Sequence, residues 1–217
     1  MNSIRKEVCL FTYTIFSLSL LFFSAFQLYQ SIYRSAAELH VENLIYTVSK
    51  ADEVNLTKAL SVKLSSFPLP LAYDLSLGAT LYEWVYYLSQ DKRYLDLQFR
   101  LREQSVQLRP TWAPIYLQRA KLYRRLDNSK EKDMLDLALY FGPNALSSLI
   151  YNLDYTFSHW DNVSRESQVK AANQLLGVWS QFNYRSELNQ MIEFSRGKQR
   201  ICNLITFNNL SVESCKM

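Results

Sequence analysis

Glycine, proline and histidine are scarce in this chain of 217 residues, which contains four glycines, five prolines and two histidines. Glycine supplies the tight turns of β-barrels and the close backbone approaches of nucleotide-binding α/β domains, so the composition argues against both classes. A helical protein needs few glycines, and the sequence therefore predicts an all-α fold. The fifteen tyrosines, by contrast, are about twice ordinary usage and supply aromatic surface with polar tips.

Sequence motifs of catalysis and cofactor binding are also absent. The chain has no phosphate-binding glycine loop, no HExxH zinc motif and no nucleophile elbow. Only His40 and His159 offer an imidazole base, and the cysteines lack neighbouring ligands that would complete a zinc site. We therefore predict a non-catalytic protein without cofactor or metal. A glycan-modifying enzyme that uses two carboxylates far apart in sequence remains the alternative.

The N-terminal region contains a long apolar stretch, with no charged side chain from Val8 to Tyr33. Residues 9–30 are long enough to cross a bilayer core of about 30 Å, so we predict a transmembrane helix there. Arg5 and Lys6 precede it, and the positive-inside rule then places residues 1–8 in the cytoplasm and the rest of the chain outside. A cleaved signal peptide is the alternative, although its apolar region is usually shorter.

The segment after the span is expected to be helical over residues 31–67, either as a stalk or as the first helix of the globular domain. Pro68 and Pro70 interrupt any helix, and we predict a domain boundary there. Residues 71–200 are expected to form paired antiparallel helices with short breaks. The expected helices cover residues 71–90, 93–108, 111–126, 130–141, 144–159, 164–182 and 186–196.

The paired helices have a repeat-like spacing. Pro110 and Pro143 lie 33 residues apart, and each follows a predicted helix. A helix-turn-helix period near 34 residues is typical of tetratricopeptide repeats, in which small residues such as Ala120 and Ala138 let the two helices pack closely. The predicted architecture is therefore a transmembrane helix followed by a degenerate tetratricopeptide-like solenoid.

The C-terminal segment, residues 201–217, is expected to be a tail outside the helical repeats. It carries Cys202 and Cys215, which would close a loop of about 14 residues and stabilise the fold by about 3 kcal/mol if bridged. Such a disulfide favours an oxidising compartment. Two unpaired thiols on a frayed tail are the alternative.

Positive charge is concentrated in residues 91–133, which hold eleven Lys/Arg against six Asp/Glu, a net charge of +5 compared with +4 for the whole chain. Arg109 lies in this basic region. In the repeat frame, the positions that line the concave, ligand-facing groove of tetratricopeptide-repeat proteins are occupied here by Pro114, Leu117, Lys121, Arg124 and Arg125. Basic side chains at one-turn spacing suit carboxylates of a partner protein or an acidic glycan, and a solvated helix face is the alternative. Nucleic acid is not an expected partner outside the cytoplasm.

Clustered aromatic residues allow two interpretations. They are either the core of degenerate repeats or flat surfaces that stack on sugar rings. The residues concerned are Tyr82, Trp84, Tyr86, Tyr87, Trp112, Tyr116, Tyr151, Tyr155 and Trp160.

Two short segments carry a family resemblance, LRPTW at Leu108–Trp112 and ALYFGPN at Ala138–Asn144, together with the N-terminal span and the C-terminal cysteine pair. In these features the chain resembles the VpsP-type proteins of bacterial exopolysaccharide gene clusters. The resemblance implies a single-pass inner-membrane protein with a periplasmic helical domain, which assists polysaccharide biosynthesis or export without catalysis. Its expected partners are polysaccharide synthesis or export proteins and acidic polysaccharide. An adaptor of an unrelated envelope complex is a further alternative.

Overall fold

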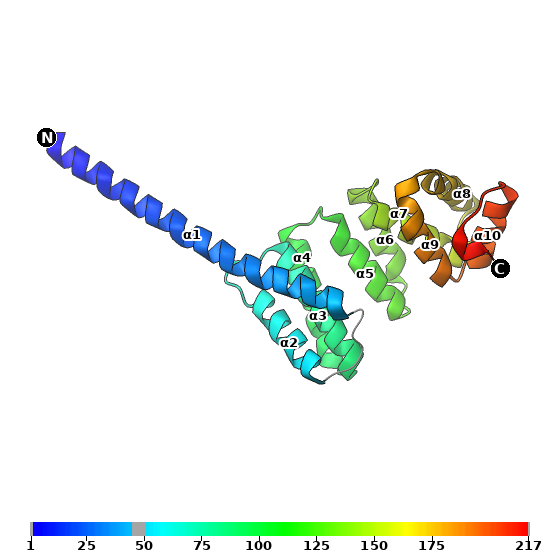
Figure 1. The fold of residues 1–217 in the computed structure, drawn as a ribbon, viewed down its shortest axis with the longest axis horizontal. Helices are drawn as coiled ribbons and strands as arrows, with labels where there is room; N and C mark the ends of the chain where they lie inside the picture. Colours follow the sequence, from blue (N-terminus) through cyan, green and yellow to red (C-terminus); the bar gives the residue numbers. More distant parts are fainter. Residues whose placement is uncertain (1, 45–50, 217) are drawn as a thin grey trace. The chain divides into compact units, whose positions relative to one another are not determined.

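A computed structural model describes the backbone of residues 2–44 and 51–216, and the side chains of residues 10–44 and 54–216. This part of the chain is all-α, with ten α-helices, three short 3₁₀-helices and no strand (Figure 1). The prediction of an all-α fold that begins with a long apolar helix is confirmed.

The chain divides into two compact units, Met1–Pro110 and Thr111–Met217. This division corrects the predicted boundary near Pro68 and the predicted single domain over residues 71–200. The two prolines of the 66–71 segment do break the helix, but the helices on either side of them pack against each other within the first unit. The break is therefore a turn inside a helical hairpin, not a linker.

Four helices form the first unit: α1 (Asn2–Leu44), α2 (Ala51–Ser65), α3 (Ala72–Ser89) and α4 (Lys92–Leu108). Helices α2, α3 and α4 pack as successive antiparallel neighbours, and the C-terminal part of α1 lies against α2 and α3 (Figure 1). One buried apolar cluster joins α1, α2, the loop after α2 and α3, and it is formed by Ala37, Leu60, Leu64, Phe67, Leu77 and Leu81. Of the two predictions for residues 31–67, the structure therefore supports a part of the globular unit over a stalk.

A buried arginine ties α3 to α4. The Arg102 side chain is almost fully buried, and its guanidinium donates to Glu83 Oε2 at 2.5 Å and to Gln98 Oε1 at 2.5 Å. A buried charge is tolerated in a protein core only when it is paired and hydrogen-bonded, so these contacts fix the register of the two helices.

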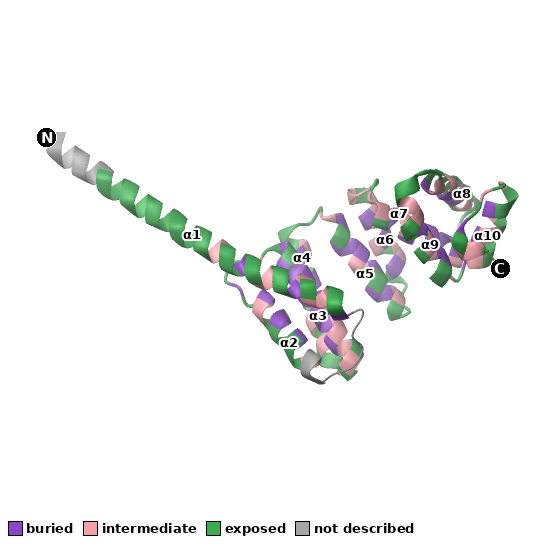
Figure 2. Ribbon diagram, in the orientation of Figure 1, coloured by how far each residue is buried: buried purple, intermediate pink, exposed green. Residues whose placement is uncertain are grey.

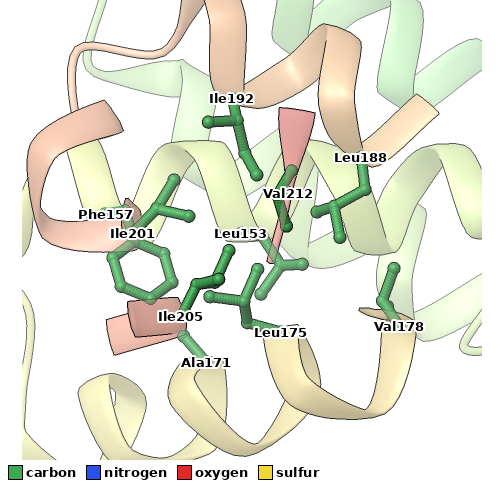
Figure 3. Close-up of a cluster of buried hydrophobic side chains, with 10 residues drawn as sticks. All are labelled: Leu153, Phe157, Ala171, Leu175, Val178, Leu188, Ile192, Ile201, Ile205 and Val212. Carbon is green, nitrogen blue, oxygen red and sulfur yellow. The ribbon is translucent and has the colours of Figure 1, made fainter. Parts of the chain in front are cut away.

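Six helices form the second unit: α5 (Ala113–Arg125), α6 (Lys130–Phe141), α7 (Leu146–Ser158), α8 (Arg165–Ser180), α9 (Arg185–Phe194) and α10 (Lys198–Phe207). Helices α5 and α6 form an antiparallel hairpin. The main core is a cluster of ten buried side chains contributed by α7 to α10 and the segment after α10 (Figure 3). Its members are Leu153, Phe157, Ala171, Leu175, Val178, Leu188, Ile192, Ile201, Ile205 and Val212.

The C-terminal segment is not the tail that the sequence predicts. Helix α10 places Ile201 and Ile205 in the core, and Val212 is buried beyond the end of that helix. Cys202 and Cys215 form a disulfide, with their Cα atoms 5.4 Å apart, so this part of the prediction is confirmed. The segment closes the core of the second unit because Ile201 and Ile205 lie one helical turn apart on the ten-residue helix α10 and face the same side.

Two glycines allow backbones to approach closely in the second unit. A Cβ atom on Gly197 would lie 2.6 Å from the backbone carbonyl carbon and from the Cβ atom of Phe157, and one on Gly142 would lie 2.7 Å from the Cβ atom of Ala113. Any larger residue at these positions forces a helix to move.

Candidate functional site

Helix α1 is, of the described helices, the one long and apolar enough to cross a membrane. Its residues 10–25 are all exposed, which Figure 2 shows as an uninterrupted stretch, whereas buried positions begin further along the helix. A core helix of the same composition would be mostly buried, so this exposure fits a lipid-facing segment. The side chain of Cys9 and those of the predicted tail, residues 1–8, lie outside the described side chains, although the α1 backbone begins at Asn2.

The residues of the predicted basic groove are not equally available for binding. Leu117 is buried, whereas Lys121 and Arg125 are exposed on α5. Arg109 is exposed at the end of α4 and belongs to the first unit. Arg124 is partly buried in a network of ion pairs.

Arg124 joins three helices of the second unit. Its Nε atom donates to Glu131 Oε1 on α6 at 2.6 Å, and its Nη1 atom is paired with Asp154 on α7. The guanidinium carbon lies 4.1 Å from the ring centroid of Tyr151, whose hydroxyl donates to Glu131 Oε1 at 3.0 Å. Burial raises the pKa of Tyr151 and so keeps its hydroxyl protonated as a donor. The structure thus shows a structural role for Arg124, and its predicted contact with a partner stays a prediction.

Although Lys121 is exposed by surface area, the surrounding protein atoms partly desolvate its ammonium and lower its pKa, and the nearby positive charge of Arg124 lowers the pKa further. Because both side chains are exposed, Lys121 and Arg125 remain the predicted partner-binding residues on α5.

A groove with a different set of cations lies elsewhere in the second unit, between the end of α7, α8 and α10. It encloses about 420 Å³. Arg165 and Arg200 line it together with Trp160, and the amides of Gln168 and Asn203 supply neutral polar groups. No Asp or Glu occurs among the described residues of its lining. We call this site the α8–α10 groove.

The aromatic wall of the α8–α10 groove is held in place by its neighbours. The indole of Trp160 stacks on the ring of Phe157, with centroids 5.0 Å apart and planes 18° apart. Phe157 is itself part of the core cluster (Figure 3). Gln168 Nε2 donates to the carbonyl oxygen of Trp160 at 2.6 Å, so α8 fixes the loop that carries the indole. This rigidity suits a binding surface, because little side-chain entropy is lost when a ligand stacks on it.

The cations of the α8–α10 groove are exposed, and they are held less tightly than Arg124. Arg200 Nη2 lies 2.7 Å from Asp161 Oδ2, but both side chains are exposed and an ion pair of this kind contributes little to stability. Arg165 is exposed in the first turn of α8. A ligand carboxylate therefore meets guanidinium groups that reorient without unfolding a core.

A second cavity, of about 310 Å³, lies between α6, α7 and α8. Lys132 and Lys170 line it, but so does Asp136, which is ion-paired with Lys132. The carboxylate on the wall makes this cavity less suited to an anion than the α8–α10 groove.

The aromatic residues named in the sequence analysis divide between the two interpretations. Tyr82, Tyr116 and Tyr151 are buried and belong to the packing, whereas Trp160 lines the groove. Sequence reasoning missed Arg165 and Arg200 because they lie 35 positions apart and outside the basic region, and because Arg200 is on α10, which begins after the last expected helix and runs into the expected tail.

Both histidines are engaged in hydrogen bonds with their surroundings. His40 Nε2 lies 2.8 Å from Thr57 Oγ1, and His159 Nδ1 lies 2.9 Å from the carbonyl oxygen of Tyr155 one turn earlier in the chain. In the described part of the chain, no three His, Cys, Asp or Glu side chains gather as metal ligands do.

No protein-family model matches this chain, and neither a curated protein nor a solved structure does. The resemblance to VpsP-type proteins therefore rests on its short motifs, and the chemistry of the site must be argued from the chain's own residues.

Proposed function

We propose that this protein is a membrane-anchored, non-catalytic adaptor in exopolysaccharide assembly or export, and that its second unit binds an acidic glycan in the α8–α10 groove. One observation carries the proposal: Arg165, Arg200 and the rigid indole of Trp160 line the same groove, whose described lining residues include no carboxylate, while Asp161, which pairs with Arg200, is solvent-exposed outside that lining.

The groove matches the chemistry of a uronic acid residue. Guanidinium groups form paired, charge-assisted hydrogen bonds with a carboxylate. An aromatic face provides apolar contact for the flat side of a pyranose ring. The amides of Gln168 and Asn203 donate to and accept from sugar hydroxyls. A protein partner with a single acidic side chain would use the arginines but not this combination.

The anchor and the compartment follow from two separate features. Helix α1 is long and apolar enough to cross the inner membrane once, and Arg5 and Lys6 favour a cytoplasmic N-terminus. The Cys202–Cys215 disulfide favours an oxidising compartment for the second unit. Both features support a periplasmic location, where a nascent polysaccharide passes.

Calorimetric titration of the full chain in lipid nanodiscs tests the proposal. The probes are a hexamer of galacturonic acid and a neutral hexasaccharide of glucose. We expect binding of the acidic hexamer at least about tenfold tighter than that of the neutral one, because each charge-assisted contact contributes about 1.5–3 kcal/mol. Equal affinity for both probes would refute the assignment of an acidic ligand. Shortening of the acidic hexamer would favour the alternative of a glycan-modifying enzyme.

A further inference from the structure

A cluster of aromatic rings lies where α1 leaves the predicted span. The ring centroids of Tyr29 and Tyr33 are 4.9 Å apart, and Phe67 lies 6.2 Å from the first and 6.3 Å from the second. Lys63 places its ammonium 5.1 Å and 5.2 Å from the two tyrosine rings. Aromatic rings and a lysine with its charge at the surface are typical of the interface between lipid and water.

The α2–α3 loop, residues 66–71, is fixed beside this cluster. Gln30 is fully buried, and its Nε2 atom donates to the carbonyl oxygen of Leu69 at 3.1 Å. Because a helix rises 1.5 Å per residue, Gln30 lies about 3 Å beyond Leu28 along α1. The loop is thus held at the level where the apolar stretch ends.

A buried ion pair fixes the other end of the same loop. Arg34 Nε and Nη2 donate to the Asp74 carboxylate at 2.6 Å and 3.2 Å, and Asp74 is fully buried. The same carboxylate accepts a hydrogen bond from the backbone N–H of Leu71 at 3.0 Å. The position of the loop relative to α1 is therefore set by side-chain contacts at both ends, as well as by chain connectivity.

The loop exposes apolar side chains at this level. Leu69 is 65% exposed, Leu71 is exposed as well, and so is Tyr73 in the first turn of α3. Pro68 and Pro70 carry no backbone N–H group, which lowers the cost of placing this backbone in a lipid interface. These side chains lie next to a segment whose own residues face lipid, so the same bilayer is the nearest apolar phase.

We propose that the α2–α3 loop inserts Leu69 and Leu71 into the outer interface of the membrane that α1 crosses, with Lys63 at the level of the lipid phosphates. This inference rests on the membrane anchor of the proposed function. The first unit is then held at the membrane surface, and the ligand of the loop is lipid and not a protein partner.

Collision experiments with spin labels test the inference in the full chain. The protein carries Cys9→Ser, so that each added cysteine is the single free thiol, and is placed in vesicles of phosphatidylethanolamine and phosphatidylglycerol. Labels are attached at Phe22→Cys on the span, at Leu69→Cys, and at Tyr87→Cys. Tyr87 is an exposed position 15 residues beyond the start of α3, about 22 Å further along that helix. Leu71→Cys serves as a second reporter on the loop.

Power saturation then compares collision with oxygen, which concentrates in lipid, and with a water-soluble nickel complex. We expect the ratio of oxygen collisions to nickel collisions to be at least about fivefold higher for the labels at Phe22 and Leu69 than for the label at Tyr87. If the labels at Leu69 and Leu71 are as accessible to nickel as that at Tyr87, while the label at Phe22 stays in lipid, the loop does not insert. If the label at Phe22 is itself accessible to nickel, the anchor is wrong and the inference falls with it.

Discussion

Different interactions stabilise the interior of each of the two units of this protein. In the first unit, buried ion pairs connect the helices in addition to a smaller apolar cluster, as in Arg34 with Asp74 and in Arg102 with Glu83. In the second unit, the largest element is an apolar cluster closed by a C-terminal helix and a disulfide. Polar contacts specify one geometry, whereas apolar packing and a crosslink supply stability. We infer that the first unit sets position at the membrane and that the second supports a binding surface.

The largest difference between the units is expected when one partner of a buried ion pair is removed. Arg34→Ala leaves the fully buried Asp74 carboxylate without its counter-ion, and we expect the first unit to lose about 3 kcal/mol of stability. Hydrogen exchange of the full chain, followed by mass spectrometry, shows which helices lose protection. Arg93→Ala is the matched control, because the Arg93 side chain of the Arg93–Asp91 pair is solvent-exposed and the pair should contribute little to stability. Equal loss of protection in both variants would contradict the role assigned to burial.

The disulfide gives the next largest expected effect, and it should act on the other unit. Replacing Cys202 and Cys215 by serine removes a crosslink over a sequence separation of 13, and we expect the second unit to lose about 3 kcal/mol of stability, as the loop-entropy model gives. Hydrogen exchange should increase in α9 and α10 and stay unchanged in α2 and α3. Loss of protection in the first unit would mean that the two units do not unfold separately.

Substitution of two glycines of the second unit should change stability by smaller amounts and in opposite directions. Gly197→Ala places a methyl group against the backbone of Phe157, and we expect a loss of about 2 kcal/mol because α10 must move away from α7. Gly177→Ala has no atom within 4 Å of the added carbon and lies inside α8, so it should stabilise the protein by up to about 1 kcal/mol. Chemical denaturation of the two variants measures the difference. A stabilising effect of Gly197→Ala as well would show that α10 packs less closely than the structure indicates, and a destabilising effect of Gly177→Ala would contradict the open space beside that glycine.

Helix positions were predictable where the chain carries strong breaks. Helix α6 covers the predicted residues 130–141, because a Gly-Pro pair follows it directly. Helix α4 begins one residue before its prediction, because an Asp residue at the turn precedes it. Helix α10 was missed because it is short and has a cysteine and polar residues among its apolar positions. The boundary at Pro68 was wrong because proline ends a helix whether the chain then leaves the domain or turns back into it.

The candidate site was less predictable than the fold, for a physical reason. Arg124 lies 30 residues before Asp154, and only the packing of α5 against α6 and α7 brings the two together. Sequence spacing therefore suggested an available cation where the structure shows one committed to an internal network. The α8–α10 groove likewise depends on helices that are distant in sequence, so composition and periodicity alone do not reveal it.

Paired variants show most clearly whether the second unit binds an acidic glycan through the proposed α8–α10 groove. Calorimetry with the galacturonic acid hexamer compares Arg165→Ser/Arg200→Ser with Lys121→Ser/Arg125→Ser, which removes the same charge from exposed positions on α5. We predict that the groove variant raises Kd about tenfold or more, whereas the α5 variant stays within about twofold of the unmodified protein. The opposite order would move the site to α5, and unchanged affinity in the groove variant would contradict the account.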